Sequence, residues 1–437
     1  MSWLNFFESK VELKHSFGRG LNANVSRDEE DLFNKSYEAF EKKENLNGYE
    51  YFLNSLQNYS NHTPNSNIVL VRQIDKINFE LFQGCARVIG VISDEKLEAY
   101  VIATKKEIAD VALKRYLLER NYQFTYCNYF SDDEHIKLRL SLDNIALNPH
   151  KIFFPLREIA LNADFDKEFA KSEFSGVVLE DIEHLEVVNS DELKIKYDYL
   201  QKWISDIKEK ISALPSSDNA GMQSFMLLYL LFKVDYLIAP KYALYQKITK
   251  KIIEYFLDDG VLVEAKNEEL SEFVDELEIM GFDEFCKNFY KAKYTFNPNE
   301  RATHEEIVNF IDESYIKLKW YKSNRFNQII PIMYKYIGLY LLYNYGLHPA
   351  TRALLHVLVE VQNPEFFSSL GYAPLYNSEH DSFSKRVIIS KIADIISYHK
   401  NRYKLLKPFG EELNFTSLNE FSNSFYLEIK NLNFQEI

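Results

Sequence analysis

Residues 86–104 read ARVIGVISDEKLEAYVIAT and form the clearest pair of strands in the sequence. Apolar and polar residues alternate on both sides of the polar turn SDEK, a pattern typical of two antiparallel strands joined as a hairpin. We expect strands at residues 86–92 and 97–104. Two β-rich stretches precede this hairpin, at residues 68–73 and 77–83, so the sequence predicts a sheet that extends to its N-terminal side.

A second hairpin follows at residues 122–140, YQFTYCNYFSDDEHIKLRL, with strands expected at residues 122–129 and 136–142. Between the hairpins, residues 108–120 carry apolar side chains at helical spacing and lead into the sequence YLLERN. Pro149 then opens another helix. The sequence therefore predicts an antiparallel sheet of at least five strands packed by helices.

A helix is also expected before the strands, because Ser26 and Glu29 have the spacing of a capping box. We expect it to continue to about residue 56, with Gly48 as the candidate position for an interruption. With this helix, the order of elements resembles class I type III secretion chaperones and the related YbjN-like domains. The carriers are the two hairpins, the YLLERN helix and the helix from Pro149, over about residues 36–175.

The resemblance implies that the chain binds another polypeptide, and it brings no catalytic residues. The chain departs from the family by its extra strand candidate at residues 68–73 and by its long C-terminal extension. We expect an α+β N-terminal domain at residues 36–175, after an N-terminal appendage at residues 1–35. An all-α helical domain follows at residues 185–437. Its expected helices are at residues 190–212, 224–237, 242–257, 268–280, 304–321, 328–345, 351–361 and 382–399.

The composition indicates a well-packed protein of two or three domains. The chain has 437 residues, of which 46% are hydrophobic and 15% aromatic, so a sizeable core is affordable. The net charge of −14 argues against nucleic-acid binding, which depends on clustered Lys and Arg. Three scattered cysteines and a start without a signal-peptide pattern predict a cytoplasmic, bacterial protein.

Most of the net charge comes from residues 258–284, which contain eleven acidic residues and one lysine. The expected helix at residues 268–280 has an apolar stripe, and its opposite face is acidic. The stripe consists of Leu270, Phe273, Val274 and Leu277. A solvated amphipathic helix explains this pattern.

The alternative is that this acidic face attracts a basic segment of a partner. Glu268, Glu272 and Glu276 are the candidate partner-binding residues. Basic segments within the chain, at residues 317–325 and 399–407, are possible internal partners.

A polar stripe is expected on the helix that begins near Pro349. His348, Arg352 and His356 recur every four residues and so share one face, which Glu360 continues. They are the candidate ligand-binding residues, for an anion at the helix start or for a metal ion. An ordinary polar network between helices is the other explanation. The sequence has no HExxH motif, Gly-rich phosphate loop or GxSxG elbow, so we name no catalytic residues, no metal ligands and no cofactor.

One stretch has the length of a membrane span, residues 329–347. It contains Pro331, Lys335 and Asn344, which favour a buried helix of a helical bundle. Near the N-terminus, Trp3 and Phe7 belong to an aromatic turn that can dock on the protein body or on lipid.

Three functional hypotheses follow, and we expect a binding protein rather than an enzyme. The first is a cytoplasmic protein-interaction factor, chaperone-like or an adaptor or scaffold, that binds another polypeptide. The second is a helical-domain enzyme or small-ligand sensor with a polar site near His348, Arg352 and His356. The third is a peripheral membrane protein. The sequence leaves the partner, the pathway and the oligomeric state open.

Overall fold

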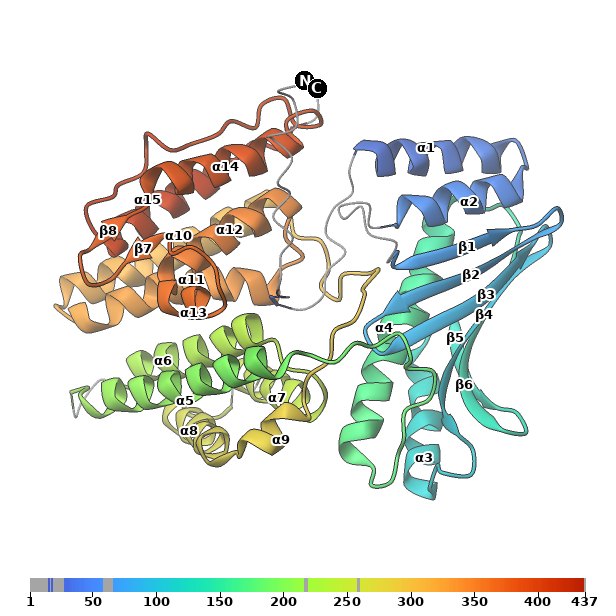
Figure 1. The fold of residues 1–437 in the computed structure, drawn as a ribbon, viewed down its shortest axis with the longest axis horizontal. Coiled ribbons are helices and arrows are strands. Elements are labelled where there is room, and N and C mark those ends of the chain that lie inside the picture. Colours follow the sequence, from blue (N-terminus) through green and yellow to red (C-terminus); the bar gives the residue numbers. More distant parts are fainter. Residues whose placement is uncertain are drawn as a thin grey trace.

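The protein forms an α+β unit followed by a helical region (Figure 1). The computed structural model describes residues 15, 17–18, 27–57, 66–215, 219–257 and 260–435. The aromatic turn predicted at Trp3 and Phe7 lies outside these residues, as does Ser26.

The α+β unit contains a six-stranded antiparallel sheet with the strand order β1-β2-β3-β4-β6-β5. Its elements are α1 (Arg27–Glu41), α2 (Asn45–Ser55), β1 (Ile68–Arg72), β2 (Lys76–Gln83), β3 (Ala86–Ser93), β4 (Lys96–Lys105), α3 (Val111–Arg120), β5 (Cys127–Ser131), β6 (His135–Asp143) and α4 (Pro149–Glu173). The predicted antiparallel sheet packed by helices is confirmed.

The register of the first hairpin follows its alternating sequence. Ile92 pairs with Leu97, and Val91 pairs with Glu98. Ile92 and Leu97 are buried, whereas Val91 and Glu98 face solvent. The turn is held by Ser93 Oγ, which accepts hydrogen bonds from the backbone amides of Glu95 and Lys96. A shift of one residue would expose the apolar set, so burial fixes this register.

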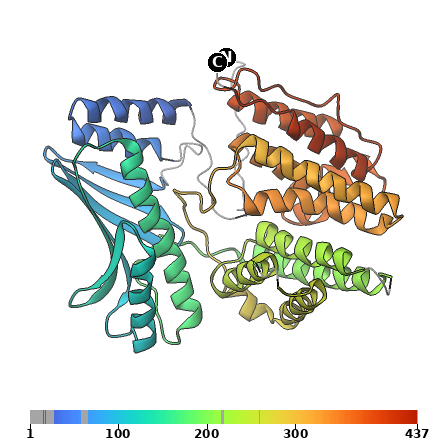
Figure 2. The same cartoon turned by 180° about the vertical axis from the view of Figure 1, so that it is seen from behind.

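Helix α4 runs along one face of the sheet, and no helix among the described residues covers the opposite face (Figures 1 and 2). Ile152, Leu156 and Ile159 of α4 are buried in the core on the covered side. On the open side, Val71 is 54% exposed and Val91 is 41% exposed. Each strand therefore has one buried and one solvated face, as expected for an antiparallel sheet covered on one side.

Two predictions of local structure are wrong. A strand was expected from residue 122, but residues 121–123 form a 3₁₀ turn and pairing begins at Cys127. The carboxylate of Glu158 on α4 accepts hydrogen bonds from the backbone amides of Thr125, Tyr126 and Cys127, so α4 satisfies these amides near the strand start. The helix expected up to residue 56, with Gly48 as its candidate break, is interrupted earlier, between α1 and α2, where Lys43 has a φ of 62°.

The helical region consists of two adjacent groups of helices (Figure 1). The first group contains α5 (Ser190–Ser212), α6 (Ala220–Lys233), α7 (Tyr242–Leu257), α8 (Val263–Ile279) and α9 (Phe282–Cys286). The second contains α10 (His304–Ser323), α11 (Ile330–Asn344), α12 (Pro349–Gln362), α13 (Pro364–Ser369), the short strands β7 (Tyr376–Asn377) and β8 (Ser382–Phe383), α14 (Lys385–His399) and α15 (Leu418–Lys430).

Every helix predicted in this region is present, although several bounds differ. The helix expected from residue 382 begins at Lys385, because Ser382 and Phe383 pair with β7 as a small hairpin. Helix α6 continues into a π-helical segment, Val234–Ile238. The sequence analysis missed the short helices α9 and α13, as well as α15.

One helix in the described part of the chain is long and apolar enough to cross a membrane, Ala220–Ile238, and 83% of its apolar window is buried inside the protein. The stretch proposed from the sequence, residues 329–347, contains α11. Met333, Ile337 and Leu341 of α11 lie in the core of the helical region. Both segments therefore pack as interior helices of this fold.

The two parts of the molecule meet along residues 287–303, here called the junction segment, which link α9 to α10. The side-chain amide of Gln83, at the end of β2, accepts hydrogen bonds from the backbone amides of Thr295 (3.0 Å) and Phe296 (2.8 Å) and donates one to the carbonyl of Phe296 (3.2 Å). The amide of Gly84 donates to the carbonyl of Lys293 at 2.9 Å. The turn between β2 and β3 therefore holds the helical region against the sheet.

Titratable groups are buried beneath this junction. The Asp164 carboxylate accepts a hydrogen bond from the amide of Cys85 at 2.7 Å, and Tyr290 donates to Glu168. Burial raises the pKa of Asp164 to about 6 and that of Glu168 to about 7. Burial alone would lower the pKa of Lys241, but the nearby Tyr294 and Glu168 raise it by more, so it stays above its ordinary value. These groups form a cation–carboxyl cluster at the boundary.

Gly84 is a testable point in the junction, because its φ of +55° and its surroundings both exclude a side chain. A Cβ there would lie 2.1 Å from Asp164 Oδ1. We expect Gly84→Ala to lower the free energy of unfolding by about 1–3 kcal/mol more than Gly176→Ala, measured by urea denaturation. Gly176 is the matched control, with a φ of +83° and no atom within 4 Å of its Cβ position. Equal losses in both variants would show that the contact with Asp164 carries no energy.

Glu168 gives the junction a pH dependence of defined sign. Its pKa is raised to about 7 in the folded protein, so the folded state binds a proton more tightly than the unfolded state. The stabilisation that protonated Glu168 gives the folded state is fully present below the ordinary pKa of a glutamate carboxyl. It is lost as pH rises through about 7, the pKa of Glu168 in the folded state. We expect Glu168→Gln to flatten the fall in unfolding free energy between about pH 5 and pH 8, in urea titrations beside the surface control Glu119→Gln. A wild-type slope in E168Q would contradict this.

Candidate functional site: an aromatic groove

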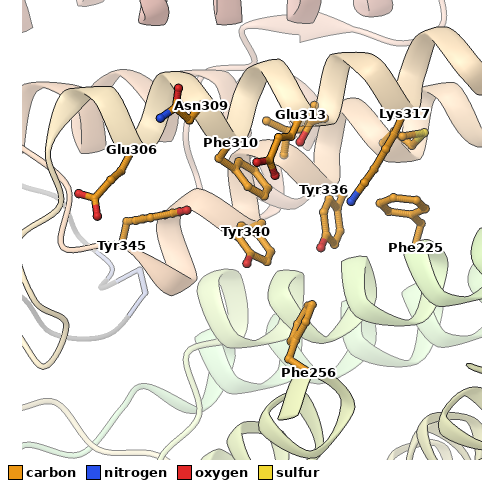
Figure 3. A pocket seen from close by; sticks show the side chains of 13 residues that line it. Phe225, Phe256, Glu306, Asn309, Phe310, Glu313, Lys317, Tyr336, Tyr340 and Tyr345 are labelled. Carbon is orange, nitrogen blue, oxygen red and sulfur yellow. The ribbon is translucent and has the colours of Figure 1, made fainter. Parts of the chain in front are cut away.

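A cavity of about 360 Å³ lies between α10 and α11 and is bounded by residues of α6 and α7 (Figure 3). Thirteen residues line it, and six of them are aromatic. The rings belong to Phe225, Phe256, Phe310, Tyr336, Tyr340 and Tyr345. We call this cavity the aromatic groove. Its volume lies within the range typical of small-ligand sites.

Tyr340 is the centre of the groove. Its ring stacks on Phe310 with centroids 4.2 Å apart and an interplanar angle of 5°. The ring of Tyr336 is 5.5 Å away along the same helix, and that of Phe256 is 6.0 Å away across the groove. These contacts hold the walls in place without a ligand. Phe256 is 40% exposed, so the groove is open to solvent on that side.

The helical repeat places the lining residues of α10 on one face. Helix α10 begins with a capping box, in which Thr303 accepts a hydrogen bond from the amide of Glu306 and Glu306 accepts one from that of Thr303. Phe310, Glu313 and Lys317 follow at intervals of three or four residues, so they point to the same side. Figure 3 shows Glu313 and Lys317 directed from α10 towards the rings of α11.

The charges in the groove differ in their local partners. Glu306 is engaged by Thr303, whose backbone amide is 2.7 Å from the carboxylate, and these hydrogen bonds lower the pKa of Glu306. Glu313 has no ion pair among the described residues. Burial raises the pKa of the Tyr340 phenol, and the charges of Tyr345 and Glu313 raise it further. The tyrosines are therefore neutral phenols at physiological pH, and the lining carries the negative charges of Glu306 and Glu313 and the positive charge of Lys317.

This chemistry suits a cation. Aromatic faces attract ammonium and guanidinium groups, and a nearby carboxylate strengthens that attraction. The lining contains no His or Cys, so it lacks the pairing of a nucleophile with a histidine base. Within the described ranges, no group of three or more His, Cys, Asp or Glu side chains is arranged to hold a metal ion. The groove is thus equipped to bind, and the residues that line it do not form a recognisable catalytic set.

The predicted polar stripe does not converge on one site. His348 is the N-cap of α12, and its Nδ1 accepts a hydrogen bond from the amide of Ala350 at 3.1 Å. Its ring packs against Tyr403 and Phe434, with centroid distances of 4.9 and 4.1 Å. Burial, followed by the charge of His399, lowers the pKa of His348 to about 3. The structure therefore gives His348 a capping and packing role.

Arg352 and His356 lie together, one and two turns further along α12. The Nδ1 atom of His356 is 2.9 Å from the hydroxyl of Tyr236, and burial lowers the pKa of His356 to about 3. Arg352 donates a hydrogen bond to the carbonyl of Phe17 at 3.3 Å. Glu360 makes a separate salt bridge with Lys391 at 2.7 Å. The stripe is thus divided among three sets of contacts.

The acidic face of α8 has cations of the chain beside it. Glu276 is 3.6 Å from Lys247 of α7, and Asp275 and Glu278 both pair with Lys208 of α5. The internal cations are therefore those of the helices that pack against α8. No ion pair among the described residues links α8 to residues 317–325 or 399–407, the segments proposed from the sequence. Glu268 and Glu272 are exposed and show no ion pair in the described part of the chain.

The sequence analysis missed the aromatic groove. Tyr336 and Tyr340 were included in an apolar helix, and nothing local distinguishes them from core residues. Their neighbours Phe225 and Phe256 come from helices about 80 to 115 residues away in the chain. The high aromatic content of the chain was the one sequence signal for such a groove, and it does not indicate which residues form it.

The comparisons with known proteins add no identification. No protein-family model matches this chain, and a search of curated proteins finds no match either. The resemblance to secretion chaperones remains a prediction based on the order of elements.

His348 gives the helical region a pH dependence opposite in sign to that of Glu168. Its pKa is lowered to about 3 in the folded state, so its stabilising effect is present above its ordinary value near 6.5 and is lost as pH falls towards 3. We expect His348→Asn, which keeps a capping side chain, to reduce the loss of stability between about pH 7 and pH 5. Thermal unfolding across this range, with exposed His380→Asn as control, measures the effect. Parallel pH profiles for H348N and wild type would contradict it.

Proposed function

We propose that this protein is an interaction factor that binds another polypeptide, and that the aromatic groove receives a basic side chain of that partner. The observation that carries the proposal is the set of six rings beside Glu313, in a groove of about 360 Å³. A lysine or arginine side chain presents an apolar stem to the rings and a charge to the carboxylate.

The expected strength suits a transient or multi-point interaction. A cation over an aromatic face contributes about 0.5–1 kcal/mol at an exposed site and about 2 kcal/mol when desolvated. An ion pair with Glu313, whose side chain is exposed, adds about 0–1 kcal/mol. One side chain in the groove therefore gives weak binding alone, and a longer segment must supply the rest.

Other surfaces support an adaptor with more than one contact. The open face of the sheet presents Val69, Val71 and Val91, which are between 41% and 54% exposed. Glu268 and Glu272 on α8, which have no ion pair with any described residue, add attraction for a basic chain at longer range. These surfaces lie on different elements from the aromatic groove, which is consistent with the two-part architecture.

A small organic cation is the second candidate ligand, because it meets the same rings and the same carboxylate. In that case the protein is a ligand sensor. The two possibilities differ in whether the residues that flank the basic group contribute to affinity.

The test uses an array of nine-residue peptides that share a Gly/Ser background and differ only at the central position. Arg, Lys, trimethyl-Lys, citrulline and norleucine occupy that position, and fluorescence anisotropy measures the dissociation constants. We expect the three cationic peptides to bind at least about fivefold more tightly than citrulline or norleucine. Glu313→Gln and Tyr340→Leu should each remove that preference.

Glu305→Gln is the control, because Glu305 is exposed on α10 and does not line the groove. It should keep the preference for cationic peptides. Free arginine methyl ester, tested in parallel, separates the sensor from the adaptor. Equal affinity for the ester and for Arg-centred peptides whose flanking residues are varied away from Gly and Ser favours a small-ligand site, whereas a flank that raises affinity above that of the ester favours the adaptor. Indifference to the central charge refutes a cation site in the groove.

A further inference from the structure

Three described residues near the N-terminus pack against the helical region. Among residues 1–26, the structure describes His15, Phe17 and Gly18, here called the docked segment. Phe17 is only 8% exposed and belongs to the core cluster of the helical region. Its ring lies 5.1 Å from both His356 and Phe367, measured between centroids.

The backbone of the docked segment is held as firmly as its ring. Arg352 donates to the carbonyl of Phe17 at 3.3 Å, and the amide of Gly18 donates to the carbonyl of Tyr236 at 2.7 Å. Gly18 has a φ of +69°, which disfavours any side chain. A Cβ at Gly18 would also lie 2.9 Å from the ring of Tyr236. The site thus selects glycine after the aromatic residue on two independent grounds.

His15 makes the outer contacts of the docked segment. Its Nδ1 is 3.2 Å from the hydroxyl of Tyr372, and its Nε2 is 3.9 Å from a carboxylate oxygen of Glu192. Glu192 is itself held by Lys196 at 3.0 Å. These contacts flank the Phe17 pocket and fix the direction in which the segment runs.

The receptor side is assembled from separate elements of the helical region. Glu192 comes from α5, Arg352 and His356 from α12, Phe367 from α13, and Tyr236 from the π-helical segment Val234–Ile238. π-Helical turns are rare and occur often at functional sites. Here the π-helical turn supplies the Tyr236 carbonyl to Gly18 and the Tyr236 hydroxyl to His356.

We propose that this pocket is a second polypeptide-binding site, specific for an aromatic residue followed by glycine, and that the docked segment is its intrachain ligand. A partner segment carrying Phe-Gly competes with the docked segment for the pocket. The site is separate from the aromatic groove, and the proposal does not depend on the function of that groove. It assigns the polar pair Arg352 and His356 to peptide recognition.

The intrachain ligand controls how the site responds. A tethered segment acts at an effective concentration of about 1 mM or more, so a free peptide of the same sequence competes poorly with it. Weakening the docked segment should therefore reveal binding that the wild-type chain conceals. We therefore expect substitutions in the docked segment to raise the affinity for a free peptide more than comparable substitutions elsewhere in the chain do.

The test uses full-length protein and a fluorescein-labelled peptide with the sequence of residues 11–22, VELKHSFGRGLN. Phe17→Ala removes the anchor ring from the chain, and Gly18→Ala displaces the segment while leaving the core side chains unchanged. We expect both variants to bind the peptide at least about tenfold more tightly than wild type does, by fluorescence anisotropy. A peptide with Ala in place of Phe should bind F17A at least about tenfold more weakly than the parent peptide.

Further controls separate this site from others. Glu313→Gln, combined with Phe17→Ala, should leave the affinity ratio between the parent and the Phe-lacking peptide unchanged, because both peptides carry the same Lys and Arg residues, so failure of the groove and failure of this site are distinguishable. Should F17A fail to fold, G18A carries the same comparison. Parent and Phe-lacking peptides that bind equally, or a parent peptide that binds neither variant, would overturn the proposal and leave the docked segment as a fixed part of the core.

Discussion

The hydrogen bonds of Gln83 to the junction segment are the constraint on which the arrangement of this molecule depends. Residues 295 and 296 are buried but belong to no helix or strand, and an unpaired buried amide or carbonyl costs about 1–3 kcal/mol. One side-chain amide satisfies two amides and a carbonyl at once. Since the junction segment leads directly into α10, the same bonds position the helix that forms one wall of the aromatic groove.

Many titratable groups of this protein have shifted pKa values, and clusters of such groups often mark active sites. Packing explains the shifts here. Glu168 is buried at the junction and accepts a hydrogen bond from Tyr290, whereas His348 caps a helix and His356 is held by Tyr236. Each group has a structural partner, and none of them lines the aromatic groove. The shifts of Glu168 and His348 therefore describe how the fold is held together. The pKa shift of Tyr340 in the aromatic groove also comes first from burial, so a shifted pKa does not by itself mark a reactive group in this protein.

Sequence reasoning worked where the pattern was local. Alternation predicted the β3–β4 hairpin, and helical spacing predicted α5 and α7 with the bounds that the structure shows. It failed where distant segments decide the outcome. The Glu158 carboxylate of α4 accepts hydrogen bonds from the backbone amides of residues 125–127. The local sequence of neither segment indicates that the two segments are in contact. The same limit hid the groove and the docked segment, because the partners of Tyr340 and Phe17 lie far away in the chain.

The aromatic residues of this chain serve the core and its binding surfaces alike. A ring such as Phe310 stacks on Tyr340 because both are held by rigid helices, and the groove is therefore formed before any ligand arrives. Preformed sites lose little conformational entropy on binding, so weak contacts suffice for selectivity. The Phe17 pocket is different, since in this structure it is filled by the chain itself. Under the two proposals, the open groove would be accessible at all times, whereas the Phe17 pocket would be accessible only to a partner that displaces Phe17.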